Sequence, residues 1–142
     1  MTLPAEKLAD MRMKHLEMLQ TVVSRMSGYG ASFKSYCITV STAVIGFALT
    51  LHRPSVVALA LLPIVFFALA DAQYLRVERR LRGMFDLVRK QDWSATPNFE
   101  IDLEKAPAES LFRCLTSWSI ASFYGALAVA DLIAVLGARR YG

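Results

Sequence analysis

The residues that could carry catalytic chemistry are few, and they lie far apart along this 142-residue chain. The two histidines are His15, in a charged stretch, and His52, in a turn between two apolar stretches. The two cysteines, Cys37 and Cys114, lie in or beside apolar stretches, where small, reduced, packing cysteines are expected. The chain has no Cys-x-x-Cys, no His-Glu-x-x-His, no nucleophile elbow and no phosphate-binding loop. The sequence therefore predicts a protein that is not an enzyme and that uses no cofactor and no metal.

Two acids inside apolar stretches are the most informative polar residues. Asp71 follows FFALA, and Asp131 interrupts AVADLIAV. A carboxylate in hydrocarbon is costly, so such a residue usually faces a partner or a wet cavity. We expect Asp71 at a membrane–water boundary, satisfied by water or by an arginine such as Arg76. Asp131 is the candidate to line a contact between subunits or a water path, and the alternative for both acids is a purely structural role.

The elements that must position these acids are stretches without charge. Apolar residues make up 55% of the chain and the mean hydropathy is +0.38, above the apolar share of ordinary soluble domains. A 17-residue helix spans roughly 25 Å, close to the lower limit for crossing a bilayer. One such helix could be a soluble core, but a chain this short could not cover three. The predicted fold is a single all-α membrane domain, with a transmembrane helical hairpin at 35–52 and 54–73 and a third C-terminal membrane helix within 108–137.

The remaining segments predict two cytoplasmic amphipathic helices. Apolar residues recur at helical spacing over 4–28, where Gly28 and Gly30 are expected to break the helix before the first crossing. The second crossing has no stop signal and continues as a cytoplasmic helix to about 91. The two apolar stripes can pair with each other, with another subunit, or with anionic lipid. The candidate face for assembly or lipid binding consists of Glu78, Arg79, Arg80 and Arg82.

The segment between the second and third crossings is predicted to be irregular over 92–107. Its alternating part, 98–103, fits one short strand or no strand, and a lone strand needs a partner. Pro107 and the acidic Glu109 fit the first turn of the final helix.

Small residues on the crossings permit close helix contact. Gly46 lies on the first crossing, while Ala121, Gly125 and Ala128 share one face of the third by their spacing of four and three. This pattern supports helix association within or between subunits, and the alternative is that these residues face lipid.

Positive charge predicts the orientation. The chain has 16 Lys and Arg against 12 Asp and Glu, a net +4 that is too mild and too scattered for a nucleic-acid groove. Thirteen of the 16 precede the first crossing or lie between the second and third, which places the N-terminus in the cytoplasm and the His52-Arg53-Pro54 turn outside. The side of the C-terminus, with Arg139 and Arg140, depends on whether the third helix crosses fully.

The order of these segments resembles a known group of proteins. HLEMLQTVVSRM, a two-crossing hairpin, the phrase DAQYLRVERRLRGMFD from Asp71, a short NFEID and a further apolar helix are similar to small bacterial multi-pass membrane proteins, the two-transmembrane (SLATT-like) effector modules of anti-phage defence systems. The resemblance implies an inner-membrane effector whose assembly compromises the membrane of an infected cell. It also implies that the trigger comes from a cytoplasmic partner or sensor protein, or from the cytoplasmic helices themselves.

The sequence thus predicts an oligomeric inner-membrane protein that perturbs the membrane or forms a channel, in contact with lipid and with copies of itself. Two alternatives remain open. One is a structural membrane adaptor that docks a cytoplasmic partner, and the other is a holin-like prophage protein.

Overall fold

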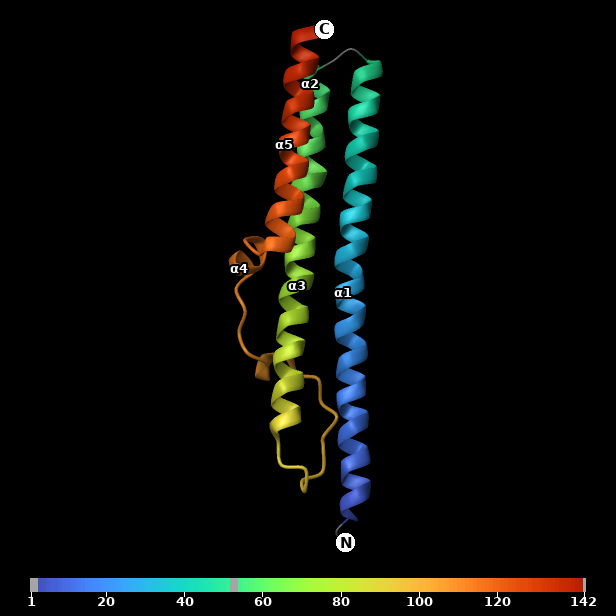
Figure 1. Cartoon of the computed structure of the whole chain (residues 1–142), viewed down its shortest axis with the longest axis vertical. Helices are drawn as coiled ribbons and strands as arrows, with labels where there is room; N and C mark the ends of the chain where they lie inside the picture. Colours follow the sequence, from blue (N-terminus) through green and yellow to red (C-terminus); the bar gives the residue numbers. More distant parts are fainter. Residues whose placement is uncertain (1–2, 52–53, 142) are drawn as a thin grey trace.

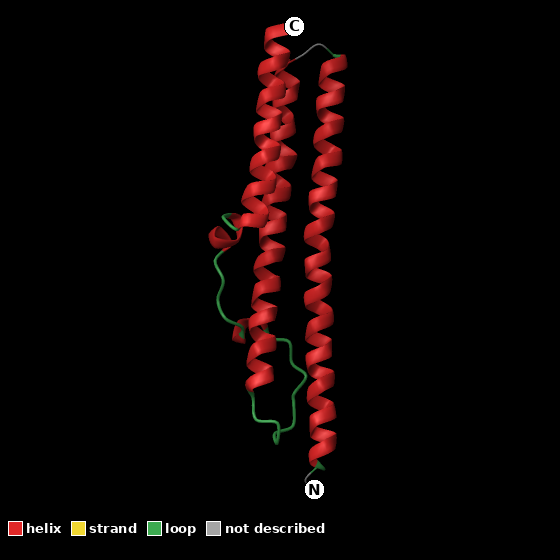
Figure 2. Cartoon of the chain, viewed as in Figure 1, coloured by secondary structure: helices red, strands yellow, loops and turns green. Residues whose placement is uncertain are grey.

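The molecule is an elongated bundle of long helices (Figure 1). The computed structural model describes residues 3–51 and 54–141. Within these ranges it contains helices and loops and no strand (Figure 2), which confirms the all-α fold class. In chain order the elements are α1 (Ala5–Thr50), α2 (Pro54–Val57), the 3-10 helix η1 (Ala58–Ala60), α3 (Leu61–Lys90), the 3-10 helix η2 (Leu103–Lys105), α4 (Leu111–Leu115) and α5 (Trp118–Tyr141).

The bundle has two halves that differ in composition. The apolar half, defined as residues 36–51, 54–70 and 118–138, contains one charged residue, Asp131. It consists of the end of α1, the consecutive elements α2, η1 and the start of α3, and α5, and these lie side by side (Figure 1). The charged half, residues 3–35 and 71–117, is an antiparallel pair of α1 and α3 with the irregular chain folded against it.

Helix α1 runs without interruption for 46 residues, so the predicted break at Gly28 and Gly30 is wrong. Glycine inside a helix costs about 1 kcal/mol relative to alanine, which is the basis of the prediction. Here packing along α3 offsets that cost. At Gly30 a Cβ atom would lie 2.9 Å from the Asp71 Oδ1 atom, so this glycine permits a close approach between helices instead of ending one.

The helical segment formed by α2, η1 and α3 is irregular only near its start. Pro63 has no N–H to donate to the carbonyl four residues earlier, and the 3-10 turn η1 lies in this region. From Leu61 the helix α3 continues to Lys90, which confirms the predicted extension to about 91. Arg89 and Lys90 in its last turn interact favourably with the negative end of the helix dipole.

The apolar stripes of the two amphipathic segments pair within the chain, the first of the three alternatives. Leu16, Leu19 and Val23 of α1 form one hydrophobic cluster with Leu81, Met84 and Val88 of α3.

The connecting segment is irregular from 91 to 110 apart from η2, and 98–103 forms no strand. The final helix does not begin at Pro107 as predicted. Helix α4 begins after Ser110, a turn at Thr116 and Ser117 follows, and α5 begins at Trp118. The physical reason is that the Glu109 carboxylate and carbonyl bind arginines of α3 instead of serving a helix N-terminus.

Two helical segments are long and apolar enough to cross a membrane, Ala58–Lys90 and Trp118–Gly137. They correspond to the predicted second and third crossings. The first crossing, in α1, stays a prediction, and the predicted outer turn at His52 and Arg53 lies outside the described residues.

Candidate functional site

Asp71 joins the three long helices at the boundary between the two halves. Its side chain is almost fully buried, and its Oδ2 atom lies 2.5 Å from the Lys34 ammonium of α1. The Tyr124 hydroxyl of α5 donates to the same oxygen at 3.3 Å. The Lys34 ammonium also lies 5.8 Å from the centroid of the Phe123 ring, a cation–π distance. The structure therefore pairs Asp71 with a lysine, whereas the sequence predicted water or an arginine such as Arg76.

The basic partner itself differs from the predicted one. Arg76, five residues after Asp71, points away around the helix and donates through Nε to the Glu109 carbonyl oxygen at 2.8 Å. Lys34 takes its place because α1 and α3 are antiparallel. Lys34 is the last charged residue before the first apolar stretch, and Asp71 is the first charged residue after the second, so the hairpin brings them side by side. Pairing these two flanking charges across the hairpin is the sequence signal that could have identified Lys34.

Asp131 lies inside the apolar half, on α5. The residue is 1% exposed, and neither carboxylate oxygen has a hydrogen-bond partner among the described residues. Around it α5 packs against α1, α2 and η1, and the apolar cluster at this end contains Ala48, Val57 and Val135. An unpartnered buried carboxyl group costs stability. The side chain therefore faces the interior of this chain, and both predicted roles, a contact between subunits and a water path, stay predictions.

The predicted assembly or lipid face is partly occupied within the chain. Arg79 forms a 2.8 Å ion pair with Glu109, and Arg80 donates to the Leu103 carbonyl oxygen. Glu78 is buried and pairs at 2.7 Å with Arg82, whose side chain remains largely exposed. The arginines at 79 and 80 therefore hold the 91–110 segment against α3.

A further arginine fixes the same segment from α1, and sequence reasoning did not single it out. Arg12 is fully buried and donates to the Gln91 side chain at 2.6 Å and to the carbonyl oxygens of Asp92 and Ala95. Hydrogen bonds from the Ser94 hydroxyl and backbone N–H lower the pKa of the Asp92 carboxyl group. The guanidinium thus clamps the chain just after the C-terminus of α3, where carbonyl oxygens carry partial negative charge.

His15, one turn after Arg12, is buried under the same segment. Its ring packs on Phe99 at 5.4 Å between centroids, and neither ring nitrogen has a hydrogen-bond partner among the described residues. Phe99 has a φ of 54°, in the left-handed region that non-glycine residues rarely adopt. The strained backbone is the means by which the 91–110 segment places an aromatic ring over α1.

The small residues of the crossings divide between two surroundings. Gly46, Ala121 and Gly125 are exposed, and a Cβ atom at either glycine would meet nothing within 4 Å. Ala128 is half-buried and packs beside the cluster that contains Tyr124. The first three therefore lie on the outside of the chain, and whether they contact another helix or face lipid stays a prediction.

The described residues contain no group of three or more His, Cys, Asp or Glu side chains that could hold a metal ion. Cys37 and Cys114 are free and buried in one hydrophobic cluster, as expected for packing cysteines. No protein-family model, curated protein or solved structure matches this chain.

Proposed function

We propose that the apolar half spans a bilayer with three crossings, by the end of α1, by α2 to the start of α3, and by α5. Each of the three helices turns large apolar side chains outward: Phe47, Leu62 and Ile133 are 63%, 67% and 64% exposed. A contiguous apolar surface of this kind is unfavourable in water and favourable in lipid. The part of α1 from residue 36 to its end at Thr50 extends about 22 Å, which is short for a crossing, so the bilayer must thin locally around it.

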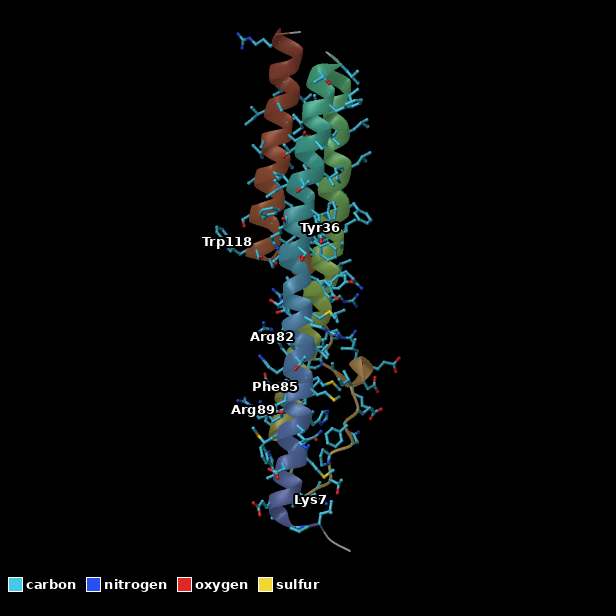
Figure 3. All side chains as sticks on the ribbon, turned by 90° about the vertical axis from the view of Figure 1, so that its right-hand side faces the viewer. Lys7, Tyr36, Arg82, Phe85, Arg89 and Trp118 are labelled. Atoms are coloured by element: carbon cyan, nitrogen blue, oxygen red, sulfur yellow. The ribbon has the colours of Figure 1, made fainter. Side chains whose placement is uncertain are left out.

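Aromatic side chains support the position of one membrane surface. Tyr36 and Trp118 are both highly exposed and lie at the same level along the bundle (Figure 3). The labelled charged residues, Lys7, Arg82 and Arg89, lie on one side of this level (Figure 3). Tyrosine and tryptophan are enriched at membrane–water interfaces, so this level fits the headgroup region. The excess of Lys and Arg in the charged half then favours a cytoplasmic N-terminus in a bacterial inner membrane.

Asp131 is the observation that carries the functional proposal. A protein that only anchors a partner needs apolar crossings and gains nothing from a buried, unpartnered carboxyl group, which destabilises the bundle. We infer that the chain perturbs the membrane by allowing ions to pass, and that it does so after assembly with further copies. The exposed faces that contain Gly46, Ala121 and Gly125 suit close contact between copies.

The resemblance to the SLATT-like effector modules adds a biological setting to this proposal, anti-phage defence, in which a cytoplasmic partner supplies the trigger. A membrane adaptor is the second candidate function. The observation that favours it is a set of exposed apolar side chains in the charged half, namely Met13, Met18, Leu87 and Trp93.

Induced expression in bacterial cells with a voltage-sensitive dye separates the two functions. The effector proposal expects depolarisation by the wild-type chain and its loss in Asp131→Leu at equal membrane content. Asp86→Asn, at an exposed position of α3, is the matched control and should depolarise like the wild type. An adaptor leaves the potential intact in all three strains. A holin-like protein would, in addition, release a co-expressed cell-wall hydrolase from the cytoplasm.

A further inference from the structure

The interior of the apolar half contains a row of buried polar side chains, although its outside is apolar. We call this row, which consists of Cys37, Ser41, Tyr124 and Asp131, the file. Cys37 and Ser41 of α1 are buried, one turn apart, with 3.9 Å between sulfur and oxygen. Tyr124 and Asp131 of α5 are buried as well, and their spacing of seven residues places them on one helix face. Each of these four side chains is at most 4% exposed.

One end of the file reaches water. Lys34 lies one turn before Cys37 on α1. Its side chain is 23% exposed, and its ammonium contacts the buried carboxylate of Asp71. The Tyr124 hydroxyl donates to the same oxygen of that carboxylate. Lys34, Asp71 and Tyr124 thus form a hydrogen-bonded connection from the cytoplasmic boundary into the apolar half.

We propose that this file conducts protons, with Asp131 as the group that binds the proton inside the apolar half. The inference rests on the proposed function and names the ion that passes. Asp131 takes a proton from water on the outer side. On the cytoplasmic side the Lys34 ammonium releases a proton to water and takes one from Asp71. Asp71 takes the hydroxyl proton of Tyr124, and Tyr124 is reprotonated from Asp131 through water. Chains of titratable side chains inside membrane helices serve this role in proton relays.

The chemistry of the interior favours a proton over a metal cation. Sodium, calcium and related cations need several oxygen ligands around one point. Asp131 has no polar partner within hydrogen-bonding distance in the described structure, and no group of three acidic, histidine or cysteine side chains occurs there. A proton needs only one base at a time and a hydrogen-bonded neighbour, which water can supply.

The path contains two apolar gaps, which explain how it stays closed. One separates Asp131 from the outer water, and the other separates it from Tyr124. In the first lies the apolar cluster of Ala48, Val57 and Val135. From Tyr124 to Asp131 the helix rises by about 10 Å. The interior positions between them are Leu127 and Ala128, which are half-buried and apolar. Water must enter both gaps before a proton crosses, and apolar constrictions of this kind gate channels by wetting and drying. Assembly with further copies, which shifts the helices, is the event that admits this water.

The test uses the full chain in vesicles of phosphatidylcholine and phosphatidylglycerol that contain the pH dye pyranine. A potassium gradient with valinomycin imposes a potential that is negative inside. We expect the wild-type vesicles to acidify internally much faster than protein-free vesicles, and Asp131→Asn vesicles to acidify at the protein-free rate. Asp131→Glu, which keeps a carboxyl group, should retain flux, and the exposed control Asp86→Asn should match the wild type.

A second variant guards against misfolding at position 131. Tyr124→Phe keeps the packing of the ring and removes the hydroxyl that contacts Asp71, so it should lower the flux while the chain remains folded by circular dichroism. Unchanged proton flux in both Asp131→Asn and Tyr124→Phe overturns the proton path. If vesicles without valinomycin leak potassium as fast as protons and Asp131→Asn leaks equally, the proton inference is wrong while the membrane-perturbing function stands. If the wild type neither acidifies vesicles nor depolarises cells, both are wrong.

Discussion

Lys34→Met breaks the ion pair at the junction of the three helices and leaves the Asp71 carboxylate buried. Its remaining partner is the Tyr124 hydroxyl at 3.3 Å. Removing one member of a buried ion pair costs about 3–5 kcal/mol. Because the Lys34 side chain keeps some contact with solvent, we expect the lower end, a loss of about 3 kcal/mol in the free energy of unfolding.

The double variant Lys34→Met, Asp71→Leu removes both charges and should lie within about 1 kcal/mol of the wild type, because no buried charge remains. Asp71→Leu alone should cost less than Lys34→Met, since a lysine can extend its ammonium to the cytoplasmic interface. The order of the three variants is therefore part of the prediction.

Reversible unfolding in detergent micelles, followed by circular dichroism, measures these differences. The control is the exposed ion pair between Arg89 and Asp86, where Arg89→Met should change stability by less than about 0.5 kcal/mol. The reasoning is refuted if the loss of stability in the double variant equals the sum of the losses in Lys34→Met and Asp71→Leu, because the two side chains then have no coupling energy.

Two further predictions concern α1. Gly28→Ala should raise the free energy of unfolding by about 0.5–1 kcal/mol, because its Cβ meets nothing within 4 Å. Gly30→Ala should raise it less or lower it, because its Cβ would lie 2.9 Å from the Asp71 Oδ1 atom. Thermal unfolding compares the two variants, and equal gains in stability would contradict the close approach at Gly30. Arg12→Met should speed hydrogen exchange and proteolysis of residues 91–95 by removing three hydrogen bonds, while the exposed Arg25→Met should not; a fully protected segment in Arg12→Met would show that the clamp is unimportant.

Charge gaps and helical periodicity predicted that the chain is all-helical and how far α3 extends, because these signals are local, but they did not predict the unbroken α1 or the start of the final helix. The extension of the second helix to residue 90 follows from an apolar stripe that continues at helical spacing with no breaker. The wrong prediction at Gly28 and Gly30 came from relying on the local helix propensity of glycine. Whether the helix continues through these residues depends on its contact with α3, whose Asp71 side chain approaches Gly30 closely.

The candidate site was predictable only in part. Asp71 and Asp131 were identifiable as acids in apolar stretches, but their surroundings depend on which faces of three helices meet, and no single segment encodes that. The arginine contacts show the same limit. Arg79 and Arg80 have the pattern of a solvent-exposed face, and only the folded chain brings Glu109 and Leu103 against them.

Oxygen and nickel-chelate accessibility of spin labels in lipid vesicles tests the three membrane crossings most directly. With Cys37 and Cys114 replaced by serine, single labels go at Phe47, Leu62 and Ile133, one outward position on each helix. The account predicts that all three labels collide readily with oxygen and poorly with the chelate. A label at Phe47 that meets the chelate as freely as a water-exposed label at Glu17 would contradict it, because α1 would then lie outside the bilayer.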